Sequence, residues 1–221
     1  MEIVFGEGGD DSKNFVDELL SAYLKYCQSK KLKTDLIFSD YGHKVIKVKG
    51  EKAGFHFRNE SGKHVCQRIP STESKGRKHT STISVAILPI RTKSNVVLNN
   101  KDLKIEAVNL GGPGGQHGNR SMSGCRMTHI PSGIKVCING RSYHSNEAQA
   151  RIVMAARIEE LEERRSKSKY EALRGSQIQG GSRSGKVRTY NFLQSRVTDH
   201  ILGSKTGNIK AVMKGRFDLL F

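Results

Sequence analysis

The chain has 221 residues, 35% of them hydrophobic and 27% charged, which suits one or two folded domains. Its 38 lysines and arginines against 21 aspartates and glutamates give a formal net charge of +17. This excess argues against an ordinary small-molecule enzyme and favours a polyanionic partner, nucleic acid before an acidic membrane surface. No apolar run is long enough to cross a bilayer and no signal peptide is visible, so we expect a cytoplasmic protein without membrane contact.

The first predicted helix covers residues 12–28, where apolar side chains recur at helical spacing. Asp11 or Ser12 is expected to cap its first amides. The preceding segment, residues 6–11, is rich in glycine. Such a turn before a helix can present free amides to a phosphate or a base edge, and a tight turn with a cap is the alternative interpretation.

Strands are predicted next at residues 43–50, around Phe55 and Phe57, and at residues 81–89, because apolar and polar side chains alternate there. Between the last two lies a long polar segment, residues 59–80. A polar loop of this length within a compact domain is usually functional or disordered.

The second half of the chain begins with a polar stretch, residues 91–103, which we interpret as a hinge. A hairpin is predicted from the turn residues Pro131, Ser132 and Gly133 between two apolar runs. Ser145 or Asn146 is expected to cap a long helix, and Asn208 a short one that stops before Gly215. The predicted elements are a strand at 104–110, hairpin strands at 127–130 and 134–138, and helices at 147–170 and 208–214.

Four cysteines, Cys27, Cys66, Cys125 and Cys137, form no Cys-x-x-Cys pair. Their spacing gives neither a zinc pattern nor a disulfide framework. We therefore expect reduced thiols that act as small buried side chains, and no metal site.

A basic segment runs from position 164 to position 188, with eight basic residues against one acid, Glu171. A charge run is often only a solvated face. Here the mixture with glycine and serine favours contact with RNA phosphates. The residues expected to make that contact are Arg164, Arg165, Lys167, Lys169, Arg174, Arg183, Lys186 and Arg188.

A glycine-rich loop lies at residues 111–116. It is not a P-loop, because no Gly-Lys-Ser/Thr closes it, and it lacks the context of a dinucleotide fingerprint. No Ser-His-Asp arrangement is available as an alternative catalytic site. From spacing alone, the loop would be interpreted as a flexible linker.

The identities of the residues favour a different interpretation. Gly114-Gly115-Gln116, in the sequence GGQHGN and followed by MTHIPSGI, resembles the catalytic loop of class I peptide chain release factors. Residues 2–11 are similar to the start of that family's decoding domain. Residues 64–81, HVCQRIPSTESKGRKHTS, resemble its codon-reading loop, and residues 188–200 its return segment. The four blocks occur in family order and cover nearly the whole chain.

The tripeptide Pro70-Ser71-Thr72 matches the Pro-x-Thr subtype of the family, which implies recognition of UAA and UAG. A threonine hydroxyl both donates and accepts, so it can test a uracil and a neighbouring adenine. By the same resemblance, His79 would stack on a splayed base, and Gln67 with Thr80 would read the third purine. Gly8 and Asp11 would lie near the first base, with Asp11 in place of the family's usual glutamate.

The Gly114-Gly115-Gln116 loop would enter the ribosomal peptidyl transferase centre and promote attack of water on the peptidyl-tRNA ester. Glycine permits a close backbone approach. The backbone N–H of Gln116 would stabilise the oxyanion, and its side chain would help to position water. The resemblance implies no cofactor, no activity away from the ribosome, and modification of Gln116 by a glutamine methyltransferase.

The expected fold is α+β, a decoding domain with a β-sheet and helices plus an inserted small α/β catalytic domain. The expected boundaries are 1–97 with 187–221 for stop-codon recognition and 98–186 for hydrolysis. The resemblance starts at Glu2, so the family's N-terminal helical domain has no counterpart in this sequence. The implied partners of a monomer are the ribosome, its RNA, an mRNA stop codon and peptidyl-tRNA.

Two alternatives to a termination factor remain. One is a ribosome-rescue hydrolase that ignores codons, for which the reading loop would be unnecessary. The other is a non-catalytic RNA-binding regulator, for which an intact Gly114-Gly115-Gln116 would be unnecessary.

Overall fold

The computed structural model describes residues 1–70, 73, 75–90, 98–109, 122–179 and 185–220. The chain forms two compact units, the first from Met1–Ile90 and Tyr170–Phe221 and the second from Arg91–Lys169. The second unit is therefore shorter at its C-terminal end than the domain expected at residues 98–186. The last turns of the long helix α3 (Tyr143–Gln179) belong to the first unit. They are held there because Arg174 binds the Glu2 carboxylate and Gln177 binds the backbone of Ile87.

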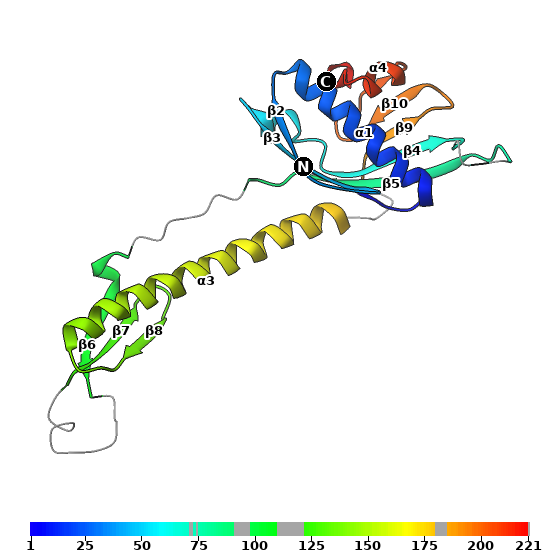
Figure 1. The fold of residues 1–221 in the computed structure, drawn as a ribbon. Coiled ribbons are helices and arrows are strands. Elements are labelled where there is room, and N and C mark those ends of the chain that lie inside the picture. Colours follow the sequence, from blue (N-terminus) through cyan, green and yellow to red (C-terminus); the bar gives the residue numbers. More distant parts are fainter. Residues whose placement is uncertain (71–72, 74, 91–97, 110–121, 180–184, 221) are drawn as a thin grey trace. The chain divides into compact units, whose positions relative to one another are not determined.

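The first unit is built on an eight-stranded sheet with the order β11-β10-β9-β4-β5-β1-β3-β2. Its strands are β1 (Glu2–Phe5), β2 (Lys33–Asp40), β3 (His43–Lys49), β4 (Gly62–Arg68), β5 (His79–Ala86), β9 (Lys186–Asn191), β10 (Arg196–Asp199) and β11 (Lys205–Thr206). Neighbouring strands are antiparallel except β4 and β9, which are parallel. Figure 1 shows the C-terminal strands β9 and β10 beside β4, so the return of the chain completes the sheet.

Helix α1 (Gly9–Ser29) packs on this sheet, with the short helix α4 (Ile209–Met213) beside it (Figure 1). Phe15, Leu19 and Tyr23 of α1 are fully buried in the main core. The 3-10 helix η2 (Phe217–Leu220) adds Phe217, which stacks on Tyr23 with 5.1 Å between ring centroids. The apolar face that the sequence predicted for α1 therefore forms the core of the first unit.

The second unit has a three-stranded antiparallel sheet of β6 (Leu103–Val108), β7 (Gly124–His129) and β8 (Lys135–Ile138), preceded by the 3-10 helix η1 (Asn100–Asp102). Helix α3 supplies the other half of its core. Met127 of β7 and Met154 of α3 are fully buried there. The small separate core explains why the unit folds around its own sheet.

The α+β class is confirmed, and so is the hairpin, whose turn residue Gly133 has a φ of +70°. Asn208 caps α4 as predicted, because its side chain accepts from the Ala211 amide. The predicted loop at residues 59–80 was wrong in its first half. That segment contains β4, a central strand whose polar side chains, such as His64, take part in buried hydrogen bonds.

Other local predictions also differ from the structure. The alternation at Phe55 and Phe57 does not form a strand, because residues Ala53–His56 form the helical turn α2 and only Phe57 is buried. Asp11 does not cap α1, which begins at Gly9 and has no side-chain cap. Asn146 lies inside α3 and donates to the Ser123 carbonyl instead of capping.

All four cysteines are free thiols. Cys27, Cys66 and Cys125 are buried as expected, and burial raises the pKa of Cys66 to about 12. Cys137 is exposed, because alternate side chains of the edge strand β8 face solvent.

Candidate functional site

Residues expected to read a codon come together at one end of the first unit. In the antiparallel register of β4 and β5, Gln67 lies opposite Thr80 and Arg68 lies opposite His79. Pro70 follows two residues after the end of β4. Ser71 and Thr72 lie outside the described residues. The paired strands β4 and β5 therefore present Gln67, Thr80 and His79 within one short stretch of the ladder.

The start of α1 lies against the same strand end. The Gly6 amide donates to the Thr82 carbonyl at 2.8 Å, and the Thr82 amide donates to the Glu7 carbonyl at 2.7 Å. Gly8 has a φ of +127°, and a Cβ there would lie 2.5 Å from Ser81 Oγ. Only glycine suits both the backbone conformation and the contact, so Gly8 is held close to Thr80 and Ser81.

Asp11 does not face outward as expected for a residue near the first base. Its side chain is 4% exposed, and its two oxygens accept separate hydrogen bonds. Arg68 Nε donates to Oδ1 at 2.7 Å and Ser81 Oγ donates to Oδ2 at 2.5 Å. The carboxylate is therefore used within the protein, which contradicts a direct base contact by this side chain.

The amide of Gln67 is oriented by the return segment. Asn191 Nδ2 donates to Gln67 Oε1 at 3.0 Å, and the Phe192 amide donates to the Gln67 carbonyl at 2.9 Å. With its Oε1 accepting from Asn191, Gln67 keeps its amide N–H groups as donors toward a ligand. The resemblance of residues 188–200 to the family's return segment thus corresponds to a contact with Gln67, a residue expected to read the codon.

Glu73 is a residue that the sequence analysis did not single out, although it lies within the reading segment. Its side chain is 6% exposed and accepts from His79 Nε2 at 2.8 Å and from Arg77 Nη2 at 3.2 Å. The Lys75 amide, together with Arg77 and His79, lowers the pKa of Glu73. The bond to Glu73 fixes the His79 ring by one edge, while the His79 side chain stays 38% exposed.

Gly114, Gly115 and Gln116 lie outside the described residues, as do Gly118 and the rest of residues 110–121. The described strands on either side of them are paired, with Val108 opposite Gly124 in the β6–β7 ladder. This pairing brings the end of β6 and the start of β7, which flank the segment, side by side at one end of the ladder.

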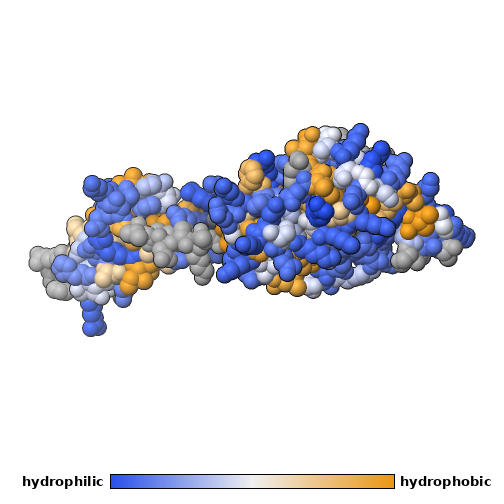
Figure 2. All heavy atoms as spheres, turned by 90° about the horizontal axis from the view of Figure 1, so that it is seen from above, coloured by the Kyte–Doolittle hydropathy of each residue, from blue (hydrophilic) through white to orange (hydrophobic). Residues whose placement is uncertain are grey.

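The basic residues expected to contact RNA fall into four groups, of which the buried Arg188 is described separately. Arg164, Arg165, Lys167 and Lys169 are exposed on α3, and Lys186 is exposed at the start of β9. Arg174 is 44% exposed, but its guanidinium binds Glu2 through two bonds of 2.7 Å. Arg183 lies outside the described residues. Hydrophilic atoms predominate on the face seen in Figure 2, which suits a chain with this charge.

Arg188 contradicts the expectation of a phosphate contact, because its side chain is completely buried. Its guanidinium binds Glu60 through bonds of 2.7 and 2.9 Å and Asp199 at 2.7 Å. Tyr23 donates to Glu60 at 2.6 Å, and burial and then the Glu60 charge raise the pKa of Tyr23 well above its usual value. We define Glu60, Arg188, Asp199, Tyr23 and His64 as the buried polar network. It joins α1, β9 and β10 and stabilises the first unit.

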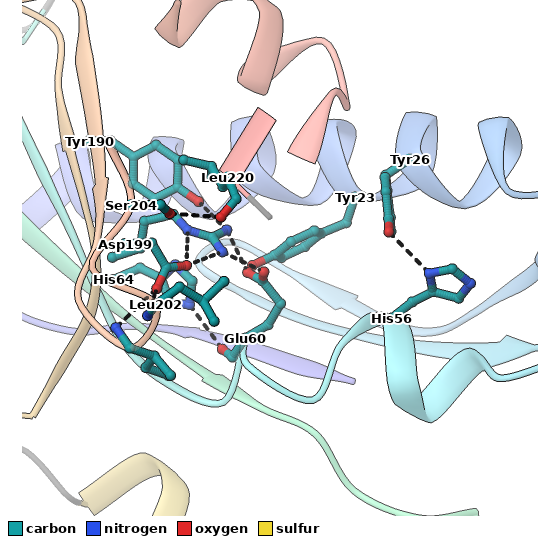
Figure 3. A network of polar contacts seen from close by, with 12 residues as sticks. Tyr23, Tyr26, His56, Glu60, His64, Tyr190, Asp199, Leu202, Ser204 and Leu220 are labelled. Atoms are coloured by element: carbon teal, nitrogen blue, oxygen red, sulfur yellow. Dashed lines mark hydrogen bonds and ion pairs between the residues drawn. The ribbon is translucent and has the colours of Figure 1, made fainter. Parts of the chain in front are cut away.

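His64 is the histidine of this network. Its Nε2 lies 2.9 Å from the Glu60 carbonyl, so Nε2 carries the proton, and Nδ1 has no hydrogen-bond partner among the described residues (Figure 3). Burial lowers the pKa of His64 to about 4. The neutral imidazole is therefore the form that the folded protein contains at physiological pH.

Acidification is expected to destabilise the first unit through His64. The unfolded chain takes up a proton near pH 6.5, whereas the folded chain does so only near pH 4. The free energy of unfolding should thus fall as the pH drops from 6.5 to 4, by about 3 kcal/mol from this one group. Urea unfolding at several pH values measures this loss. His64→Gln should remove that part of the pH dependence, and His200→Gln, at an exposed position, should keep it; equal pH profiles for His64→Gln and the wild type would contradict the assignment.

No group of three or more His, Cys, Asp or Glu side chains that could hold a metal ion occurs among the described residues. Across the same part of the chain, no helix is both long and apolar enough to cross a membrane.

Comparison with known proteins finds two family matches along the chain. Residues 1–85 match the PCRF domain family and residues 92–201 match the RF-1 domain family. Peptide chain release factor 1 of Dictyoglomus thermophilum is 41% identical over 225 residues, covering 99% of this chain and 61% of that protein. The same factor from Campylobacter hominis is 39% identical, covering 97% of this chain and 62% of that protein.

Among solved structures, RF2 of Thermus thermophilus is similar, with a TM-score of 0.57 and 28% sequence identity. The match covers 99% of this chain and 65% of that one. The chain therefore spans slightly less than two thirds of the length of the relatives that it matches.

Proposed function

Because the chain belongs to the class I peptide chain release factor family through its PCRF and RF-1 domains, we propose that it terminates translation. It recognises UAA and UAG in the ribosomal A site and promotes hydrolysis of the peptidyl-tRNA ester by water. Its partners are the ribosome, the stop codon and peptidyl-tRNA, and it needs no cofactor.

One observation carries this proposal. Gly8, Gln67, His79 and Thr80 come from three segments of the chain and lie together at the ends of β4 and β5 and the start of α1. A rescue hydrolase that ignores codons has no need of such a cluster. Stacking together with hydrogen bonds to base edges is how proteins read unstacked single-stranded bases.

The proposed roles follow from the chemistry of each side chain. Thr72 tests the first two bases through a hydroxyl that donates and accepts. The His79 ring stacks on a base while Glu73 holds its Nε2 edge. Gln67, with its Oε1 occupied by Asn191, uses its N–H groups toward the third base, together with Thr80.

Hydrolysis is assigned to Gly114, Gly115 and Gln116. The two glycines allow the backbone to approach the ester, and the Gln116 amide stabilises the developing oxyanion. The Gln116 side chain positions water and excludes larger nucleophiles. Modification of the same side chain by a glutamine methyltransferase is part of the proposal.

Substitutions in the reading segment should separate specificity from general affinity. Thr72→Ala is expected to lose discrimination at the first two codon positions, by about 1–3 kcal/mol for each lost base contact. His79→Ala is expected to weaken release at UAA and UAG together, because stacking tolerates any base. Peptide release measured on ribosomes carrying UAA, UAG, UGA or a sense codon tests both. Unchanged codon preference in Thr72→Ala would contradict the proposed role of that residue.

The exposed basic residues are proposed to contact ribosomal RNA phosphates. Replacing Arg165, Lys169 and Lys186 together by glutamine should weaken ribosome binding and flatten its log–log salt dependence by roughly two to three. Codon preference should stay the same, since phosphate contacts position a protein without specifying sequence. Ribosome affinity at several salt concentrations measures the slope. Parallel lines for variant and wild type would mean that these side chains face only solvent.

A further inference from the structure

One partly buried charge, Arg68 at the end of β4, joins the segments that are proposed to read the codon. Its Nε donates to Asp11 Oδ1 at 2.7 Å, and its Nη1 lies 2.8 Å from both carboxylate oxygens of Glu18. Asp11 and Glu18 lie two turns apart on one face of α1. Arg68 therefore fastens the first three turns of α1 to the end of β4.

The same contact continues into β5. The second oxygen of Asp11 accepts from Ser81 Oγ at 2.5 Å, so a single carboxylate is bonded to both strands. Arg68 directly follows Gln67, and Ser81 directly follows Thr80. We define Arg68, Asp11, Glu18 and Ser81 as the clamp. Two of its members are thus chain neighbours of proposed codon-reading residues.

Little water reaches the Arg68–Asp11 pair of the clamp, whereas the Glu18 side chain is 40% exposed. The side chain of Arg68 is 16% exposed and that of Asp11 is 4% exposed. The guanidinium carbon lies 5.9 Å from the ring centroid of Phe15 and 5.5 Å from that of Phe192. Charge-assisted bonds in such surroundings are stronger and less screened by salt than bonds at the surface, and the flanking rings restrict the guanidinium plane.

Other bonds keep the same elements folded without Arg68. The strands β4 and β5 pair from Gly62–Val85 to Arg68–His79 through their backbones. The segment before α1 is tied to β5 by the backbone bonds of Gly6 and Glu7 to Thr82. The clamp is therefore not needed to hold these elements together. It fixes the orientation of the start of α1 relative to the ends of β4 and β5, where Gly8 lies against Ser81.

We propose that Arg68 is a positioning residue for stop-codon recognition, which acts through Asp11 and Ser81 on Gly8, Gln67 and Thr80. The inference rests on the proposed termination function. Both oxygens of Asp11 are occupied by the clamp, so this residue also acts by holding the helix start. A binding site whose supporting side chains are locked in this way loses affinity when the support is loosened, although no direct contact is removed.

The test compares Arg68→Gln with a matched control, Lys44→Gln. Lys44 is 14% exposed and forms a 2.9 Å ion pair with Asp17, another carboxylate of α1. KM and kcat for peptide release are measured on ribosomes carrying UAA or UAG, together with the melting temperature of each protein. Asp11→Asn and the double variant Asp11→Asn with Arg68→Gln are measured as well, which completes a double-mutant cycle for the two residues.

Arg68→Gln is expected to raise KM at both codons roughly tenfold, within the usual range of coupling in an ion-pair network, while kcat stays near the wild-type value. Arg68→Lys should recover part of the loss. The double variant should be no worse than the more affected single variant, and Lys44→Gln should keep the wild-type KM. If Arg68→Gln does not fold, Asp11→Asn, which keeps the size of the side chain, carries the same expectation for KM.

Two different failures can be told apart. If the wild type releases peptide at UAA and a folded Arg68→Gln or Asp11→Asn protein has the same KM, the positioning role is wrong and the termination function stands. A tenfold effect that Lys44→Gln shares would likewise overturn the positioning role, because it would reflect loosening of α1 in general. If the wild type itself releases peptide at no codon, the proposed function fails and the inference fails with it.

Discussion

Gly115→Ala is expected to abolish peptide release while leaving ribosome binding nearly unchanged. A Cβ at this position would obstruct the close approach of the backbone to the ester and disfavour the conformations open to glycine. Displacing the oxyanion donor of the neighbouring Gln116 should lower the rate about 100- to 1000-fold. Single-turnover release from UAA-programmed ribosomes gives the rate, and a filter-binding affinity for the same ribosomes gives the binding.

Gln116→Ala provides the control for this prediction. It keeps the backbone N–H, so its rate should fall less than that of Gly115→Ala, and larger nucleophiles should compete with water. Release at the wild-type rate by Gly115→Ala would mean that residues 114–116 are not the hydrolytic loop.

Arg188→Met is expected to destabilise the first unit by about 3–5 kcal/mol. The substitution leaves the Glu60 and Asp199 carboxylates buried without their shared cation, whose contacts of 2.7 Å it removes. Methionine occupies a similar volume, so the loss would reflect charge and hydrogen bonding more than a cavity. Urea unfolding followed by circular dichroism measures the change in free energy.

Arg164→Met is the matched comparison for Arg188→Met. Arg164 pairs with Glu160 on the surface of α3, with side chains 77% and 61% exposed, so its loss should barely change stability. A destabilisation by Arg188→Met as small as that of Arg164→Met would contradict the structural role of the buried polar network.

Helix α1 could be predicted from the sequence because its apolar face carries the signal. Phe15, Leu19 and Tyr23 recur at helical spacing and are buried. Strand β4 could not be recognised in the same way. It lies between β5 and β9, and two of its inward positions are His64 and Cys66, so the polar side chain that satisfies the buried network hides the apolar pattern.

Charged residues were harder to interpret than apolar ones. Arg188 and Lys186 look alike in the sequence, within one basic segment, yet one is buried and the other exposed. The partners that bury Arg188 are Glu60, 128 positions away, and Asp199, 11 positions away. No local spacing rule identifies these partners, because the sheet brings them together. Asp199 lies opposite Arg188 in the antiparallel β9–β10 ladder, and Glu60 lies two residues before β4, the parallel neighbour of β9.

In the candidate site, too, some residues could be recognised from the sequence and others only from the structure. The residues proposed to read the codon were identified through the resemblance of four ordered blocks, whereas Arg68, Ser81 and Glu73 became visible only through their contacts. For Asp11, the sequence pattern and the structural contacts suggest different roles. Its position in the family pattern suggested a contact with a base, and its geometry shows a carboxylate that binds Arg68 and Ser81.

The most direct test of the proposed function is peptide release by the unmodified protein from ribosomes that carry UAA, UAG, UGA, a sense codon or an empty A site. We expect release at UAA and UAG and none at UGA, the sense codon or the empty site. Equal release on all five would mean a hydrolase that ignores codons, and release on none would mean that the chain is not a termination factor.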